Sequence, residues 1–368
     1  MSITSSVVIA TGPARGLVGG VTRHLQLLEQ IAANLSIDLV HFEIGRRHGE
    51  AGASARLWRL ITDYREFARA LKAAGRSGRS VVAHVNSSIR PVCVARDVGF
   101  VLIARLLRVP VIYQVHGCLL QGPDDGRIWL RRSARWVLGL ADRVVVLSQA
   151  QSRAIGGAAA QRAIPVNNAV QMMPRVYRSP ATARPLHILF LSRLVPEKGV
   201  MLCLEAMQRL KTQGVAAQLS MAGSGPMLHK LPDQVREMGL ADCVRVLGFV
   251  SPQQTRECLL AHDLMWLPSL IPEGQPYALL EALEVGMPVV VTRAGAVLGE
   301  MIDEAARHGA PLLEIGPTAE ALAEVTAALA ADADSFQGLQ VAARELAETV
   351  YSMKSVLPRW RHVWQVST

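Results

Sequence analysis

Short apolar runs alternate with longer amphipathic segments along most of the chain. Val7–Ala10 is continuously apolar, and Val81–Val85 and Val111–Val115 are apolar except for one polar residue each. All three runs are rich in β-branched residues, which is typical of strands buried on both faces. Apolar positions in Leu57–Ala74 recur at helical spacing instead, with arginines on the opposite face. This alternation predicts an α/β fold, in which helices cover parallel sheets.

The alternation occurs twice, once on each side of Pro174–Pro185, a stretch with three prolines and little periodicity. Each half therefore predicts one Rossmann-like α/β domain. The other strands expected in the first half are Ile37–Phe42 and Asp142–Leu147. Those expected in the second half are Leu186–Leu191, Gln218–Ala222, Val244–Leu247, Leu264–Leu267, Pro288–Val291 and Leu312–Ile315. The last helices, from about Ala321 to Val366, are expected to be amphipathic.

Net charge divides the chain in the same place. Residues 1–178 carry 24 Lys and Arg against 10 Asp and Glu, a net charge of +14, whereas residues 179–368 have 15 against 20, a net charge of −5. Such a basic half favours an anionic partner: nucleic acid, anionic lipid or a phosphorylated substrate. A soluble protein that is merely rich in arginine is the alternative.

Cysteine content and hydropathy indicate the compartment. The chain has five cysteines, an odd number, and none of them has the spacing of metal ligands. Both features favour a reducing environment. Met1–Ser6 is polar, so no secretory signal is expected, and Val98–Val115 is interrupted by two arginines and a proline. A cytoplasmic protein, or one peripheral to the cytoplasmic face of the inner membrane, is expected.

Chemistry should concentrate in the loops after the strands, because ligands of open parallel sheets bind there. The segment Pro268–Val291 is the richest: it reads as a strand, a loop with Glu273 and Gly274, a helix containing Glu281, a turn and a strand. Free backbone N–H groups at a helix start bind anions, and carboxylates accept hydrogen bonds from vicinal hydroxyls. Two glutamates beside such a helix start suit a nucleotide-sugar.

This segment closely resembles the Glu-x7-Glu signature of family 4 of the retaining glycosyltransferases, which have the GT-B fold. The resemblance implies that Glu273 contacts donor-sugar hydroxyls and Glu281 the ribose. It also implies that the backbone from Gly274 through Gln275, Pro276, Tyr277 and Ala278 to Leu279 approaches the sugar and diphosphate. One departure is Ala294-Gly295-Ala296, where the family often has Gly-Gly.

A second resemblance is Leu191–Gly199, after the first strand of the second half. Two cations around a turn can hold a diphosphate from two sides. In the family, an Arg and a Lys at the positions of Arg193 and Lys198 bind the diphosphate and stabilise the departing nucleotide, as a metal does elsewhere. Neither a metal nor another cofactor is therefore expected, and Asp332-Ala333-Asp334 is interpreted as solvated surface.

Resemblances in the first half are looser. Gly19 and Gly20 open the first helix, as they do in the family, where this backbone meets the donor phosphate or the acceptor. Val115-His116-Gly117 resembles the family's strand-end His-Gly, whose His lies beside the donor sugar; a buried hydrogen-bonding histidine is the alternative. The donor base is expected to be read near Gly223 and Val250.

Taken together, the resemblance implies three regions: an acceptor-binding domain (1–178), a nucleotide-sugar-binding domain (179–345) and a C-terminal helix (346–368) that packs on the first. The implied reaction is front-face transfer of a hexose from a UDP- or GDP-sugar, with retention of configuration, to a lipid-linked or polysaccharide-precursor acceptor. Domain closure is expected to exclude water.

The basic first half then suggests contact with an anionic membrane. The cations expected on that face are Arg46, Arg47, Arg56, Arg59, Arg65, Arg69, Lys72, Arg76 and Arg79. Alternatives are an epimerase or phosphorylase of the same fold, a catalytically silent subunit, and a basic membrane- or nucleic-acid-binding protein. Sparse aromatics and the absence of a recognition motif in the sequence argue against nucleic acid.

Overall fold

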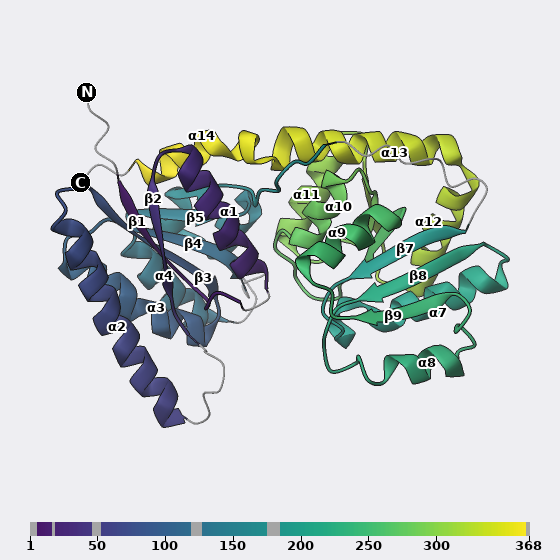
Figure 1. The fold of residues 1–368 in the computed structure, drawn as a ribbon, viewed down its shortest axis with the longest axis horizontal. Coiled ribbons are helices and arrows are strands. Elements are labelled where there is room, and N and C mark those ends of the chain that lie inside the picture. The colour runs from purple at the N-terminus through teal and green to yellow at the C-terminus, as the bar shows by residue number, and fades with distance from the viewer. Residues whose placement is uncertain (1–5, 17–18, 46–52, 119–126, 175–184, 366–368) are drawn as a thin grey trace. The chain divides into compact units, whose positions relative to one another are not determined.

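A computed structural model of the chain describes residues 6–16, 19–45, 53–118, 127–174 and 185–365. It divides into two compact units, of which the first comprises Met1–Ala169 with Met353–Thr368 and the second Val170–Ser352. Each unit contains one parallel sheet with helices on both faces, which confirms the predicted α/β class (Figure 1). The assignment of the units to acceptor and donor binding stays a prediction.

The sheet of the first unit has the order β2-β1-β3-β4-β5-β6, and every adjacent pair is parallel. Its strands are β1 (Val7–Gly12), β2 (Asp38–Glu43), β3 (Val81–Ile89), β4 (Val111–Cys118), β5 (Arg143–Val146) and β6 (Ala163–Pro165). Its helices are α1 (Gly20–Asn34), α2 (Ala53–Gly75), α3 (Pro91–Leu106), α4 (Ile128–Gly139), α5 (Gln149–Ile155), α6 (Gly157–Gln161) and α14 (Met353–Trp364).

Alternate residues of these strands face different helices, because successive side chains in a strand point to opposite sides. Val7 and Ile9 pack with helices α2 to α4, whereas Val8 packs with α1 and α14. The last helix thus contributes to this unit's core through Trp360 and Trp364, which are buried. Strand β1 reads as the apolar run VVIA because both of its faces are covered, whereas the edge strand β2 is partly exposed.

The second unit repeats the plan, with the sheet order β12-β11-β10-β7-β8-β9 and parallel pairing throughout. Its strands are β7 (Leu186–Leu191), β8 (Ala217–Ala222), β9 (Val244–Gly248), β10 (Leu264–Leu267), β11 (Val289–Thr292) and β12 (Leu312–Ile315). Its helices are α7 (Val200–Thr212), α8 (Leu231–Glu237), α9 (Pro252–Ala261), α10 (Tyr277–Glu284), α11 (Ala296–Ala306), α12 (Ala319–Ala331) and α13 (Ala333–Leu346), with a 3-10 turn at Pro196–Lys198 and a π turn at Ala347–Tyr351.

Two cores enclose this second sheet. Helices α7, α8 and α12 pack on one face, and α10 and α11 pack on the other. The face of α10 matters for function, since this helix starts directly after the Glu273 loop. Leu279, Leu280 and Leu283 are buried and hold α10 against the sheet. The Glu273 loop, which precedes this helix, therefore ends on a rigid element.

Candidate active site

Lys198 and Glu273 form an ion pair in the second unit. Lys198 ends the 3-10 turn after β7, and Glu273 lies in the loop after β10. Because β7 and β10 are adjacent parallel strands, their loops emerge side by side at the carboxyl edge of the sheet. Lys198 Nζ donates to Glu273 Oε1, and the two side chains are only 10% and 12% exposed. Each charge, being largely removed from water, depends on its partner.

Close approach of these two loops requires Gly199. This residue has φ 76°, in the left-handed region, and a Cβ built on it would lie 2.2 Å from the Pro268 carbonyl oxygen. The Leu270 N–H donates to the Glu197 carbonyl oxygen at 2.8 Å, which binds the loops together. Any side chain at position 199 would push the two members of the ion pair apart.

Arg193 lies in the same loop as Lys198, but its side chain is exposed. Within the described parts of the chain, it takes part in no ion pair. Its backbone is nevertheless well fixed, because the Leu194 N–H donates to the Ser224 carbonyl oxygen at 2.9 Å. A rigidly mounted guanidinium with no carboxylate partner is suited to bind an anionic ligand.

Gly223 holds the next loop against that of Arg193. A Cβ at Gly223 would lie 1.8 Å from the Ser192 carbonyl oxygen, so no other residue fits without displacement. The Gly223 N–H donates to the Gly248 carbonyl oxygen at 2.7 Å, at the end of β9. Val250, partly buried, follows two residues later. The loops after β7, β8 and β9 therefore meet at one edge of the sheet.

Helix α10 begins at Tyr277, with Pro276 as its N-cap and no side-chain cap. The Glu273 N–H donates to the Ala294 carbonyl oxygen at 2.9 Å, which connects this loop to the one after β11. Glu281 lies one turn into the helix and is partly exposed, as the sequence predicted. Gln275 is buried between them. The structure thus places Glu273 in the loop before α10 and Glu281 in the middle of that helix.

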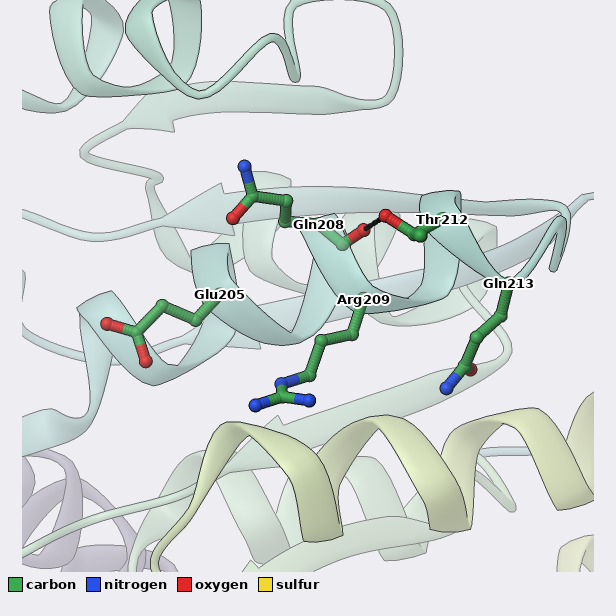
Figure 2. A pocket seen from close by; sticks show the side chains of 5 residues that line it. All are labelled: Glu205, Gln208, Arg209, Thr212 and Gln213. Carbon is green, nitrogen blue, oxygen red and sulfur yellow. Dashed lines mark hydrogen bonds between the residues drawn. The ribbon is translucent and has the colours of Figure 1, made fainter.

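The described residues of this unit line at least two hollows. One lies beside the Glu273 loop, at the ends of β10, β11 and β12, and its lining includes Ser269, Thr292 and Arg293. The other runs along the outer face of α7 and is lined by Glu205, Gln208, Arg209, Thr212 and Gln213 (Figure 2). None of the predicted site residues lines either hollow, although the first lies at strand ends next to the Glu273 loop and the second lies on a helix.

In the first unit, His116 lies near the end of β4 and contacts Asn86 of β3, with 3.0 Å between His116 Nε2 and Asn86 Oδ1. An amide oxygen only accepts, so Nε2 carries the proton and Nδ1 keeps its lone pair. Burial and the neighbouring histidines lower the pKa of His116 well below its usual value. The neutral side chain is therefore held in one tautomer.

Two further histidines surround His116. The ring of His24 lies 4.4 Å from that of His116, and His24 Nε2 bonds Gln114 Oε1 at 3.0 Å. His84 is fully buried beside Trp360 and Trp364. Burial lowers the pKa of His24 to about 4 and that of His84 to about 3. Both side chains are neutral at physiological pH.

Gly19 and Gly20 lie at the start of α1 and are exposed. A Cβ at Gly19 would meet nothing within 4 Å, and its φ of 170° is open to any residue. Packing of the chain itself thus gives no reason for glycine at position 19.

Sequence reasoning assigned no role to several residues that the structure places at these loops. Ser269 Oγ donates to Glu273 Oε1, and Thr292 Oγ1 donates to the Ser269 carbonyl oxygen at 2.6 Å.

In the first unit, His84 and Asn86 alternate on β3 as Gln114 and His116 do on β4. This polar alternation near strand ends was the signal that could have identified the cluster.

None of the helices in the described ranges is long and apolar enough to cross a bilayer. Likewise, no cluster of three His, Cys, Asp or Glu suited to a metal ion occurs among the residues with assigned positions. Arg46 and Arg47 of the expected basic face lie outside the described residues.

Two family models match the chain. "Glycosyl transferase 4-like domain" matches residues 6–168, and "Glycosyl transferases group 1" matches residues 178–345. Among curated relatives, the amylovoran biosynthesis glycosyltransferase AmsK of Erwinia amylovora is 36% identical over 115 residues, 30% of this chain and 28% of that protein. The exopolysaccharide phosphotransferase SCO2592 of Streptomyces coelicolor is 29% identical over 262 residues, 70% of this chain and 26% of that protein.

The chain spans only 26% to 30% of the length of four curated relatives that it matches, AmsK and SCO2592 among them. Similarity to solved structures extends over the whole fold. Anabaena HepE in complex with UDP-glucose superposes with a TM-score of 0.69 at 19% identity, covering 97% of this chain and 98% of that chain. Sucrose-phosphate synthase from Thermosynechococcus elongatus gives 0.71 at 16% identity, covering 98% of each. With both halves matched by family models, the chain belongs to the group 1 glycosyltransferases of family 4, which have the GT-B fold.

Proposed function

We propose that this protein is a retaining glycosyltransferase that moves a hexose from a UDP- or GDP-sugar to an acceptor hydroxyl. One observation carries the proposal: a nearly buried Lys198–Glu273 pair at the strand ends of the second unit, in the same loop region as Arg193, an exposed cation that forms no ion pair with any described residue. Family membership supports it. The similar protein HepE has been crystallised in complex with UDP-glucose.

The cations would act on the diphosphate. Charge develops on the leaving nucleoside diphosphate as the glycosidic bond to the sugar breaks, and fixed cations in a poorly hydrated site stabilise that charge. The Lys198 side chain is nearly buried, whereas Arg193 carries an exposed guanidinium that is free to adopt a bidentate geometry. On this account, Lys198 exchanges its carboxylate partner for phosphate oxygens when the donor binds.

The glutamates would then bind hydroxyl groups. Glu273, released from Lys198, accepts hydrogen bonds from hydroxyls of the donor sugar, and Glu281 accepts them from the ribose. The leaving diphosphate takes the proton of the incoming hydroxyl, so the acceptor attacks from the face that the nucleotide leaves and configuration is retained. His116, Gly19, Gly20, Gly223, Val250 and the backbone of Gly274 to Leu279 are proposed to contact the donor.

The acceptor class is inferred from relatives and charge. AmsK and SCO2592 are named for amylovoran and exopolysaccharide chemistry, which supports a polysaccharide-precursor or lipid-linked acceptor here. The net charge of +14 on residues 1–178 fits an acceptor that carries a diphosphate, or an anionic membrane surface on the cytoplasmic side.

A panel of UDP-, GDP- and ADP-sugars tests this proposal. Thermal stabilisation by one nucleotide class, followed by acceptor-dependent release of that nucleotide and an unchanged anomeric configuration in the product, is the expected result. Release of an epimerised free sugar without acceptor would instead identify an epimerase, and dependence on inorganic phosphate would identify a phosphorylase. Failure of every donor to bind would remove the enzyme proposal.

A further inference from the structure

Helices α2, α3 and α4 lie on the same face of the first unit's sheet (Figure 1). Their inner sides are fixed in one core, to which Phe67, Val101 and Val137 contribute from the three helices. Helix α3 contacts both of the others and lies between them. The outer sides of the three helices therefore form one continuous surface, which we call the α2–α4 face.

Along the middle of the α2–α4 face, α3 presents apolar side chains. Val92 is 81% exposed and Leu106 is 82% exposed, and Leu102 lies between them at helical spacing. A soluble protein exposes single apolar residues freely, but a row of them on one helix marks a surface that contacts something else. Their burial would remove apolar area from water.

Tryptophans flank this row on both sides. Trp58 of α2 and Trp129 and Trp136 of α4 are between 54% and 77% exposed. The other tryptophans of the chain, Trp266, Trp360 and Trp364, are almost fully buried. Exposure is thus confined to the tryptophans of this face.

Cations complete the pattern. Arg65, Arg69 and Lys72 follow Trp58 along one stripe of α2, and Arg132 lies between the two tryptophans of α4. All four are exposed, and in the described parts of the chain none forms an ion pair. Glu66 is the one exposed acidic side chain that the structure describes on these helices, since Asp63 and Asp97 are buried.

We infer that the α2–α4 face docks on the surface of an anionic lipid bilayer, with its tryptophans and the apolar row of α3 at the headgroup level and its cations on the phosphates. Indole rings prefer that interface, because one edge is apolar and the N–H needs a polar partner. A second copy of the chain fits less well, since a symmetric contact would bring like charges together. Nucleic acid would leave the aliphatic row without a partner.

This inference deepens the proposed membrane partner by assigning it a surface. It rests on the proposed function only for its purpose, which is to hold the acceptor-binding unit near lipid-linked substrates. Such a surface binds reversibly, through buried apolar area and attraction to anionic headgroups together. Both contributions should therefore be separately removable by substitution.

Flotation of the full chain with vesicles tests the α2–α4 face. Phosphatidylcholine vesicles are compared with phosphatidylcholine–phosphatidylglycerol vesicles, at low and high salt. We expect binding to the anionic vesicles alone, partly lost at high salt. Arg65→Gln/Arg69→Gln/Lys72→Gln should weaken it about a hundredfold, since each cation near an anionic surface contributes several-fold. Trp129→Ala/Trp136→Ala should abolish the salt-resistant part.

Matched controls lie in the second unit: Leu247→Ala for an exposed apolar residue and Arg236→Gln/Arg245→Gln for exposed cations. Circular dichroism verifies folding, and donor binding by the same variants separates the two proposals. Lost vesicle binding with intact donor binding supports the inference. No binding of wild type to anionic vesicles at low salt, equal effects of the control variants, or self-association without vesicles would overturn it. Donor binding lost everywhere with docking intact would count against the enzyme proposal alone.

Discussion

Lys198 and Arg193 lie five residues apart but occupy different environments. Lys198 is nearly buried against Glu273, whereas Arg193 is exposed and, among the residues with described positions, without an ion pair. Removing one member of a buried pair leaves the other charge uncompensated. Removing an exposed, unpaired cation has no such consequence. The two residues should therefore differ in what they contribute to folding, although both are proposed to hold the diphosphate.

We predict that Lys198→Ala lowers both stability and kcat, the latter by about a hundredfold or more, as loss of one oxyanion-stabilising group does. Donor KM should change much less, because the contact strengthens as charge develops. Arg193→Ala should lower activity with an unchanged melting temperature. Steady-state kinetics and thermal unfolding measure both effects. Equal losses in kcat and donor affinity for Lys198→Ala would argue against a transition-state role.

His84 should make stability depend on pH, because burial lowers its pKa to about 3. Below pH 6.5 the unfolded chain binds a proton at His84 that the folded chain does not, so acid lowers the free energy of unfolding. Each such histidine contributes a slope of about 1.4 kcal/mol per pH unit between these values. His84→Asn should reduce the slope by that amount in urea unfolding between pH 4 and 6. An unchanged slope in His84→Asn would show that another group is responsible.

At the residue scale, the sequence indicated where the candidate site residues lie but not which side chains contact each other. Strand-end loops and the spacing of Arg193, Lys198, Glu273 and Glu281 located the candidate site. The contact between Lys198 and Glu273 depends on which strands are adjacent, and periodicity does not specify strand order. His24 and His84 were missed for a similar reason: a histidine in an apolar pattern carries no sign of its neighbours.

At the scale of elements, the loops after β7, β8 and β9 pack closely against each other at glycine positions. Gly223 has φ 147°, and its would-be Cβ lies 1.8 Å from the Ser192 carbonyl oxygen. Backbone rather than a flexible side chain opposes it, so the loops cannot yield cheaply. The arrangement fixes the base of the Arg193 loop independently of any ligand.

Gly223→Ala should consequently destabilise the protein by about 3 kcal/mol or more and weaken donor binding, because the Arg193 loop must shift. Gly316→Ala is the matched control, since its Cβ would meet nothing within 4 Å. Chemical unfolding and donor titration measure the two effects. Near-wild-type stability for Gly223→Ala would mean that the contact is not as rigid as the geometry indicates.

Most strands were predictable because they are short, largely apolar runs between helical segments. The short β6, Ala163–Pro165, was not expected, and neither were α5 and α6, since a few residues show no period. The C-terminal segment was expected as helices from about Ala321. In the structure it is interrupted at Asp332, whose side chain accepts from the Ser335 N–H as the N-cap of α13.

For the whole molecule, charge and exposure give different information. Net charge from the sequence indicated that the first half meets an anionic partner, but it named cations without saying which are exposed. Among these cations, the structure separates exposed Arg65 and Arg69 from partly buried Arg79, which is paired with Asp38. It also shows which tryptophans are exposed, which no periodicity disclosed. A membrane surface is therefore argued from the α2–α4 face rather than from charge alone.

The central claim is that Arg193, Lys198, Glu273 and Glu281 form a metal-independent site for a nucleotide-sugar. Calorimetric titration of the full chain with UDP- and GDP-sugars, in EDTA, tests it most directly. Wild type should bind donors of one nucleotide class, and Arg193→Ala/Glu281→Ala should lose that binding while its fold, by circular dichroism, is kept. Binding that this double variant leaves unchanged, or no binding of wild type to any donor, would contradict the account.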